Sequence, residues 1–269
     1  MIRVVVLGSG TSHGVPAIGC DCDVCRSADP RDKRTRPSIL IQIPGSDPHP
    51  FADAVRSILV DTSTDLRTQA IDNDVRRVDA ILFTHTHADH VFGIDDVRRF
   101  NQMQRRAIPC FADEGTVAAL KTMFAYIFEP PKQQGGGLPQ LSLFQIAGPF
   151  TLGGLDVIPV PLFHGVLPVL GFRIGSFAYL TDCNRVPDAS LDLLSGVRTL
   201  IIDALRHRPH STHFSVNEAI EVASRIGATR TYFTHICHDL PHAATCASLP
   251  PGVELAYDGL VLDVLEIPG

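Results

Sequence analysis

The sequence of 269 residues lacks a basic excess, a long apolar run and an internal repeat. It has 23 lysine and arginine residues against 29 aspartate and glutamate residues, and its formal net charge is −6. General nucleic-acid binders usually carry a basic excess, so the charge disfavours that class. No stretch approaches the roughly 20 continuous apolar residues of a membrane-spanning helix. We therefore expect neither a nucleic-acid partner nor a membrane.

The first residues, MIRVVVLGSGTS, contain one arginine and an apolar run too short for a secretion signal, so we expect a cytoplasmic protein. The chain has seven cysteines, and three of them lie within CDCDVC at 20–25. In a chain without a secretion signal, this pattern favours thiolates that bind a metal over disulfides. No linker separates two units, and 45% hydrophobic residues can supply one large core, so we expect a single domain over 1–269.

Short apolar runs predict a strand-rich fold. Strands are expected at 2–7, 38–43, 57–62, 79–85, 107–112, 141–146, 155–160, 169–174, 177–181, 199–204 and 230–235. Helices are expected at 95–106, 113–128 and 216–226. Ser215 and Glu218 form a capping box for the last helix, and Gly227 ends it. Many connections are short enough for hairpins, which favours layered sheets with helices outside over a doubly wound parallel sheet.

Two further regions stand out. The long segment 9–36 contains glycines, prolines and the cysteine cluster, which indicates a structured loop. The region 113–139 ends in EPPKQQGGGLP, and it is either a lid over a site or a plain surface connection. Basic residues also cluster at 31–36, 98–100 and 104–106. These clusters are either solvated surface or a local field that attracts a small anionic substrate.

Five apolar, strand-like runs end at a residue that can bind a metal, and one of them opens into FTHTHADH at 83–90. The five residues are His85, His164, Asp182, Asp203 and His235. Neighbouring strand ends can meet at one rim of a sheet sandwich, and imidazole and carboxylate ligands suit zinc, manganese or iron. The sequence offers seven candidate ligands: His85, His87, Asp89, His90, His164, Asp182 and His235. One ion needs only three or four, so we expect two ions, with Asp182 bridging them through its two oxygens.

The segment THTHADH matches the T-H-x-H-x-D-H signature of the metallo-β-lactamase superfamily, and the later candidate ligands follow in the order of that family. The chain thus resembles this superfamily over nearly its whole length. The resemblance implies an α+β fold, a four-layer αββα sandwich with a two-metal site at one edge. It also implies that one ion is bound by His85, His87 and His164 and the other by Asp89, His90 and His235.

Cys20, Cys22 and Cys25 form C-x-C-x-x-C, one ligand short of a closed tetrahedral zinc site. His238 is the expected fourth ligand, with Cys237 as the competitor; the alternative is three free thiols in a loop. A zinc ion here would hold the N-terminal loop against the C-terminal strand. The combination of this cluster with the dinuclear ligands resembles the branch that contains phosphoribosyl 1,2-cyclic phosphate phosphodiesterase.

These features predict a metal-dependent hydrolase with two catalytic divalent ions, zinc or manganese, and one structural zinc. We expect a phosphodiesterase that cleaves a small anionic phosphate ester, which could be cyclic, with a hydroxide shared by the two ions as the nucleophile. Asp89 and Asp182 belong to the catalytic set as metal ligands. The resemblance implies a general acid in the segment 203–215, where His213 is preferred over His210, and His207 is assigned to the surface.

Alternative functions are a hydrolase of the same fold for an ester, lactone or thioester, or a non-catalytic binding protein stabilised by zinc. Metal content separates the binding protein from the hydrolases, because only the hydrolases need the two further ions. The resemblance also makes a homodimer an expectation, since related proteins are often dimeric.

Overall fold

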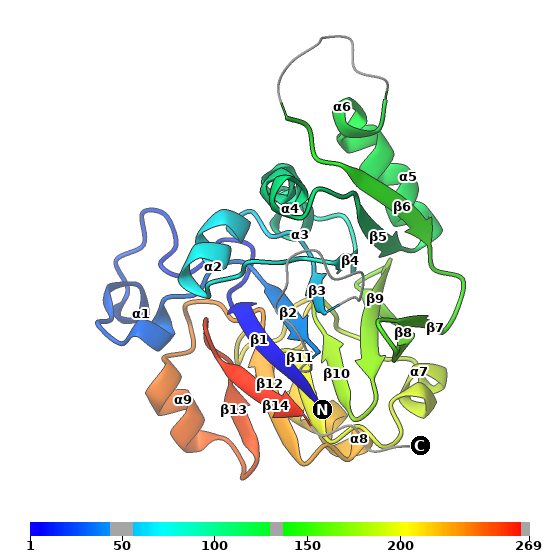
Figure 1. The fold of residues 1–269 in the computed structure, drawn as a ribbon. Helices are drawn as coiled ribbons and strands as arrows, with labels where there is room; N and C mark the ends of the chain where they lie inside the picture. Colours follow the sequence, from blue (N-terminus) through cyan, green and yellow to red (C-terminus); the bar gives the residue numbers. More distant parts are fainter. Residues whose placement is uncertain (44–55, 130–136, 265–269) are drawn as a thin grey trace.

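The computed structural model describes residues 1–43, 56–129 and 137–264. Two seven-stranded sheets pack face to face, and helices cover the outer side of each sheet (Figure 1). Buried apolar residues from both sheets fill the space between them, among them Val4, Val60, Phe172 and Ile201. This arrangement is the four-layer αββα sandwich, and the α+β fold class predicted from the sequence is confirmed.

The first sheet has the strand order β14-β1-β2-β3-β4-β5-β6. Its strands are β1 (Ile2–Gly8), β2 (Ser38–Gln42), β3 (Ser57–Val60), β4 (Ala80–Leu82), β5 (Ile108–Ala112), β6 (Leu141–Gln145) and β14 (Val261–Val264). β14, β1, β2 and β3 pair antiparallel, whereas β3, β4, β5 and β6 are parallel neighbours. As a result β1, β3 and β4 run in the same direction and end at one edge of the sheet.

The second sheet has the order β13-β12-β11-β10-β9-β8-β7. Its strands are β7 (Phe150–Leu152), β8 (Leu155–His164), β9 (Leu167–Ile174), β10 (Phe177–Leu180), β11 (Thr199–Asp203), β12 (Arg230–Thr234) and β13 (Val253–Leu255). β10 to β13 are parallel neighbours, and β9 is antiparallel to both β8 and β10. The chain therefore leaves β8, β10, β11 and β12 at the same edge, which is where their terminal side chains can meet.

Helices lie on both outer faces of the sandwich (Figure 1). The first sheet is covered by α2 (Leu66–Asp72), α3 (Ala88–Val91), the 3-10 helix η2 (Ile94–Val97), α4 (Arg98–Gln104), α5 (Glu114–Met123) and α6 (Ala125–Phe128). The second is covered by α7 (Asp188–Leu193), α8 (Val216–Ile226) and α9 (His242–Ser248). The N-terminal loop contains α1 (Asp23–Arg26) and the 3-10 helix η1 (Pro30–Asp32). Within the described ranges, no helix combines the length and the apolar character needed to cross a membrane.

Helix α8 confirms the capping analysis. The Ser215 side chain accepts from the Glu218 N–H, the Glu218 carboxylate accepts from the Ser215 N–H, and Gly227 ends the helix with φ of 77°. The continuous helix predicted at 113–128 is wrong, because it breaks at Phe124 between α5 and α6. The Phe124 ring is buried against the first sheet, so tertiary packing overrides the local helical pattern there.

Other departures from the prediction concern short or irregular elements. The helix predicted at 95–106 is divided into η2 and α4, in line with the common use of 3-10 turns at helix starts. β7, β13 and β14 have only three or four residues each, too few for a visible periodicity. Residues 130–136, part of the region 113–139 for which a lid was one interpretation, lie outside the described residues.

A partly buried carboxylate, that of Asp258, closes the base of the N-terminal loop. Asp258 Oδ1 accepts from the N–H and the hydroxyl of Ser9, both at 2.8 Å. Asp258 Oδ2 accepts from the N–H and the hydroxyl of Thr35 at 2.7 and 2.6 Å. One side chain therefore joins the two ends of the loop. Burial raises the pKa of Asp258 to about 6, although the four donors act in the opposite direction.

This raised pKa predicts a pH-dependent stability. The folded state binds the Asp258 proton more tightly than the unfolded chain, in which an aspartate has a pKa of about 3.9. Protonation of Asp258 therefore favours the folded state. This contribution to the free energy of unfolding is lost as the pH rises through the folded-state pKa of about 6. The free energy of unfolding of the wild type, minus that of Asp258→Asn, should fall by about 1 kcal/mol between pH 5 and pH 7.

Urea unfolding at constant metal content measures this difference. The matched control is Asp188→Asn on α7, because the Asp188 side chain is 93% exposed. Its difference from the wild type should stay constant over the same pH range. A difference for Asp258→Asn that is flat, or that grows with pH, would contradict the prediction.

Candidate metal centre

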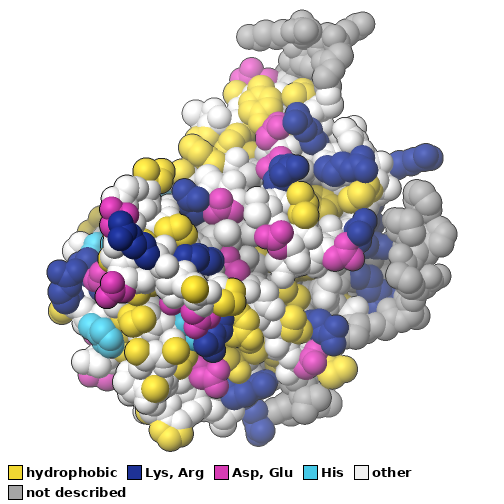
Figure 2. Space-filling view, turned by 90° about the vertical axis from the view of Figure 1, so that its left-hand side faces the viewer, with side chains coloured by type: hydrophobic (Ala, Val, Ile, Leu, Met, Phe, Trp, Pro, Cys, Tyr) yellow, Lys and Arg dark blue, Asp and Glu magenta, His cyan; other side chains and the backbone are white. Residues whose placement is uncertain are grey.

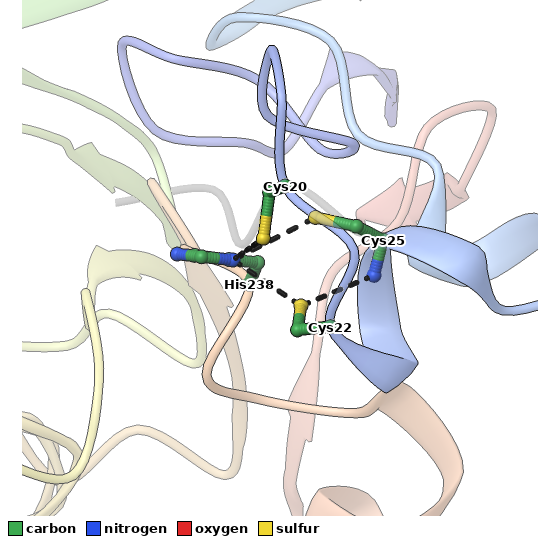
Figure 3. Close-up of side chains that lie close together, drawn as sticks. All are labelled: Cys20, Cys22, Cys25 and His238. Atoms are coloured by element: carbon green, nitrogen blue, oxygen red, sulfur yellow. Dashed lines mark hydrogen bonds between the residues drawn. The ribbon is translucent and has the colours of Figure 1, made fainter.

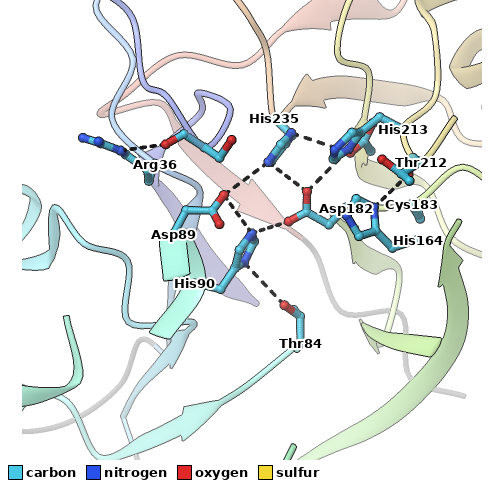
Figure 4. A network of polar contacts seen from close by, with 12 residues as sticks. Arg36, Thr84, Asp89, His90, His164, Asp182, Cys183, Thr212, His213 and His235 are labelled. Carbon is cyan, nitrogen blue, oxygen red and sulfur yellow. Dashed lines mark hydrogen bonds and ion pairs between the residues drawn. The ribbon is translucent and has the colours of Figure 1, made fainter. Parts of the chain in front are cut away.

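Four of the predicted ligands meet at the edge where the strands end (Figure 4). One ligand atom from each of Asp89, His90, Asp182 and His235 lies within 4.8 Å of all the others, and all four residues are buried. His235 Nε2 lies 2.8 Å from Asp182 Oδ1 and 3.5 Å from Asp89 Oδ2. His90 Nε2 lies 3.6 Å from Asp89 Oδ2 and contacts Asp182 Oδ2.

The other three predicted ligands form a looser group beside these four. The ring centres of His85 and His87 are 4.6 Å apart, and that of His164 lies 5.1 Å from His87 and 5.9 Å from His85. His85 Nε2 is 3.6 Å from Asp182 Oδ2. Asp182 thus lies between the two groups, and the structure brings all seven predicted residues to one place.

The backbone at this edge is in an unusual conformation. Asp61, Asp182 and His235 follow β3, β10 and β12, and each has a positive φ, of 63°, 48° and 58°. The left-handed region costs a residue with a side chain about 1–2 kcal/mol. Strain of this kind is typical of functional sites, where it persists because the surrounding structure enforces it. In this protein, the left-handed residues lie where the chain turns after three of the strands that supply the site.

Asp61 is a site residue that the sequence analysis missed. It is fully buried and accepts from His90 Nδ1 at 2.7 Å and from the N–H and hydroxyl of Thr84 at 2.8 and 2.7 Å. This contact orients the His90 ring so that Nε2 faces the cluster. Histidines that bind a metal commonly donate their other ring N–H to a carboxylate in this way. Burial raises the pKa of Asp61, and His90 opposes this. The signal was present, because Asp61 also follows a strand, but the predicted strand extended past it to residue 62.

His213 lies inside the cluster. Its Nδ1 donates to Asp203 Oδ2 at 2.8 Å, and its ring stacks on His235 with 4.5 Å between ring centres and 13° between planes. The His164 ring lies 4.5 Å away on another side. His210 is further out, with its ring centre 5.2 Å from that of His213, and His207 is exposed, as expected. Asp203 ends β11, and its role as the partner of His213 was not predicted.

The donor atoms of this cluster fit divalent cations. Five buried atoms of this cluster lack a well-formed hydrogen bond even where they lie close together: His85 Nε2, His90 Nε2, Asp182 Oδ2 and both ring nitrogens of His235. An unsatisfied buried polar atom costs about 1–3 kcal/mol, so this many in one place indicates a missing charged partner. Burial and the neighbouring His90 lower the pKa of His85 well below its ordinary value, which leaves a neutral imidazole with a free lone pair. Although burial opposes it, the cationic form of His235 holds the pKa of Asp182 well below its ordinary value.

The cysteine cluster forms a second candidate metal site (Figure 3). The sulfur atoms of Cys20, Cys22 and Cys25 lie 3.1, 3.3 and 3.6 Å from His238 Nδ1. The N–H of Cys25 lowers the pKa of Cys22 to about 6, whereas burial raises that of Cys25 to about 11. Cys237 is not part of the group, because its sulfur accepts from the N–H of Asp239.

Arg34 connects this cluster to the rest of the fold. Its side chain is fully buried and donates to the carbonyls of Cys237 and Leu240 at 2.8 and 2.6 Å, on either side of His238. It also donates to Asp32 at 3.0 Å. The N-terminal loop therefore holds the segment that carries both His235 and His238 through hydrogen bonds of its own.

Comparisons with known proteins agree with this geometry. Residues 56–236 match the family model of the beta-lactamase superfamily domain. The chain is 38% identical over 263 residues to an octanoyltransferase of Porphyromonas gingivalis; the match covers 96% of this chain but only 51% of that protein. The chain therefore spans about half the length of this relative. Coenzyme PQQ synthesis protein B of Methylorubrum extorquens is 31% identical, with 98% of this chain and 100% of the relative covered.

Among solved structures, a diphosphatase from the PhnP family superposes with a TM-score of 0.88 and 42% identity, covering 99% of both chains. Zinc-bound PqqB from Methylobacterium extorquens has a TM-score of 0.72 and 21% identity, covering 97% of this chain and 100% of that one, which shows a shared fold. The chain therefore belongs to the metallo-β-lactamase superfamily of metal-dependent hydrolases and is related to the PhnP family.

Proposed function

We propose that the protein is a dinuclear metal-dependent hydrolase whose preferred substrate is a small phosphodiester. The observation that carries this proposal is the position of Asp182, with one oxygen 2.8 Å from His235 and the other 3.6 Å from His85. A carboxylate between two groups of imidazoles can bridge two cations. The 42% identity to a PhnP-family diphosphatase supports phosphorus chemistry and makes a diphosphate the second candidate substrate.

The seven ligands divide into two sets in this proposal. His85, His87 and His164 would hold one ion, and Asp89, His90 and His235 would hold the other, with Asp182 shared. When bound, two such ions lower the pKa of a coordinated water and neutralise charge on a phosphoryl group. The remaining polar groups orient the ligands: Asp61 fixes His90, and the Thr212 carbonyl lies 2.8 Å from His164 Nδ1.

The chain itself supplies the proton for the leaving group. Asp203 accepts from His213 Nδ1, so this contact fixes the ring and directs Nε2 away from the carboxylate. A proton on Nε2 can then be given to the departing alkoxide, which is a poor leaving group near neutral pH. Asp203 stabilises the imidazolium before the transfer. We propose His213 as the general acid in preference to His210, because His213 is the one in contact with the cluster.

The alternatives from the sequence analysis differ in measurable ways. A hydrolase for esters, lactones or thioesters would use the same ions, whereas a zinc-stabilised binding protein would need only the cysteine site. The octanoyltransferase relative is about twice as long as the region that matches, so its name does not by itself favour acyl chemistry here. A cytoplasmic location and a homodimer remain predictions.

Substrate preference should follow the phosphoryl proposal. Bis(p-nitrophenyl) phosphate should be hydrolysed with added Mn²⁺ or Zn²⁺ faster than p-nitrophenyl acetate or a lactone, each corrected for its uncatalysed rate. A nucleoside diphosphate derivative tests the second candidate. Preferential turnover of the acetate or the lactone would contradict the assignment to phosphorus chemistry.

Removal of the proposed acid should lower turnover without removing metal. His213→Ala should reduce kcat for a phosphodiester with an alkoxide leaving group by about 10²–10⁴-fold, the range for general acid catalysis. A substrate with a p-nitrophenolate leaving group should be affected less, since that group needs no proton. His207→Ala is the matched control and should be as active as the wild type. An active His213→Ala enzyme would remove this residue from the mechanism.

The cysteine cluster should bind its own ion. Elemental analysis of loaded protein should find close to three ions per chain, and Cys22→Ser should lose about one of them together with several degrees of melting temperature. Cys246→Ser, outside both clusters, should change neither value. An unchanged metal content and melting temperature in Cys22→Ser would disprove a structural zinc site.

A further inference from the structure

A groove with a volume of about 540 Å³ lies away from both metal sites, between α2 and the η2–α4 segment. Its lining includes Arg98 and Arg99, from the basic cluster at 98–100 that the proposed reaction does not use. The view of the side of the molecule that carries α2 shows basic and apolar side chains next to each other on this face (Figure 2). The volume lies in the range of ligand sites, about 300–1,000 Å³.

The groove has an apolar floor. Leu66, Val75 and Phe100 are buried there, and Met103 is partly exposed. Ile71 projects from α2 with 61% of its surface exposed. The accessible apolar surface of the groove therefore comes mainly from Ile71 and Met103, because Leu66, Val75 and Phe100 are only 1%, 9% and 4% exposed.

The rim is mainly cationic. Four arginines and two aspartates line the groove: Arg67, Arg76, Arg98, Arg99, Asp74 and Asp96. Arg76 pairs with Asp74, and Arg98 pairs with Asp95. Within the described ranges Arg67 has no ion pair, and Arg99 has only a 3.4 Å contact to Gln102. The positive charges of Arg67 and Arg99 are therefore not compensated at the rim, although the net charge of the protein is −6.

We propose that this groove is a docking site for an acidic peptide segment that inserts an apolar side chain. The charged side chains lie at the exposed rim, and each buried residue that lines the floor is apolar. Sites for small ligands place a few polar groups deep in the pocket to fix orientation, and the floor of this groove lacks them. An apolar centre with a polar rim is instead the anatomy of a protein–protein contact. Carboxylates of the partner pair with Arg67 and Arg99, and its apolar side chain covers Ile71.

Fluorescence anisotropy with defined peptides tests this proposal. The probe is a fluorescein-labelled peptide of glutamate and leucine, compared with a glutamate–serine peptide and a lysine–leucine peptide. The glutamate–leucine peptide should bind saturably, and its affinity should fall with added NaCl because the rim contacts are screened. Equal binding of the glutamate–serine peptide, or no saturable binding of the glutamate–leucine peptide, would overturn the proposal.

Variants locate the binding to the groove. The double variant Arg67→Glu, Arg99→Glu and the single variant Ile71→Asp should each weaken binding by about tenfold or more. Arg225→Glu on α8 reverses the charge of one arginine outside the groove and should bind like the wild type. All three should keep the wild-type melting temperature and the wild-type hydrolysis of model substrates, since these residues are outside the metal centre. Affinities that stay unchanged in both groove variants would place the binding elsewhere and sink the proposal.

Sedimentation velocity separates this occupant from a second copy of the chain. The wild type and the double variant should sediment alike. If the wild type sediments as a dimer and the double variant as a monomer, the groove is a self-association surface and the acidic-peptide proposal is wrong.

Discussion

The structure depends on one electrostatic constraint: two buried carboxylates, Asp89 and Asp182, and several imidazoles are held close together at one edge of the sandwich. Asp182 is buried, and one of its oxygens and the ligand nitrogens of three histidines around it lack a well-formed hydrogen bond. Without a cation, these groups would be a large net cost to folding. With one, the same atoms become a preorganised ligand set. The site is therefore the place where folding and function require the same charge.

The fold meets this requirement through strand direction. β3, β4, β8, β10, β11 and β12 all end at one edge, so each supplies a residue to the same small volume. Three of these residues adopt a left-handed backbone, which costs energy locally and is compensated by the packing of the two sheets. The N-terminal loop adds external support, because Asp258 closes its base and Arg34 holds the segment that carries His235 and His238.

Much of this arrangement was predictable because the ligands are chemically distinctive and follow visible strands. The segment 83–90 and the strand-end positions of His164, Asp182 and His235 identified the centre. The cysteine spacing identified the second cluster, and geometry places His238 rather than Cys237 beside it. Asp61 was missed because its strand was predicted two residues too long. Asp203 was noticed only as a strand end, since a carboxylate that orients a histidine has no sequence signature of its own.

The sequence by itself determined which groups are present and in what order: seven candidate ligands, three clustered thiols and enough apolar strands for two sheets. The tertiary structure decided the pairings, because these depend on distances between residues far apart in the chain. Only folding shows that Asp203 holds His213, that Asp182 lies between two groups of histidines, and that α2 and α4 leave a groove with a cationic rim. Local patterns record the period of a strand or helix, whereas a contact between strand ends is set by the direction and order of the strands in the sheet.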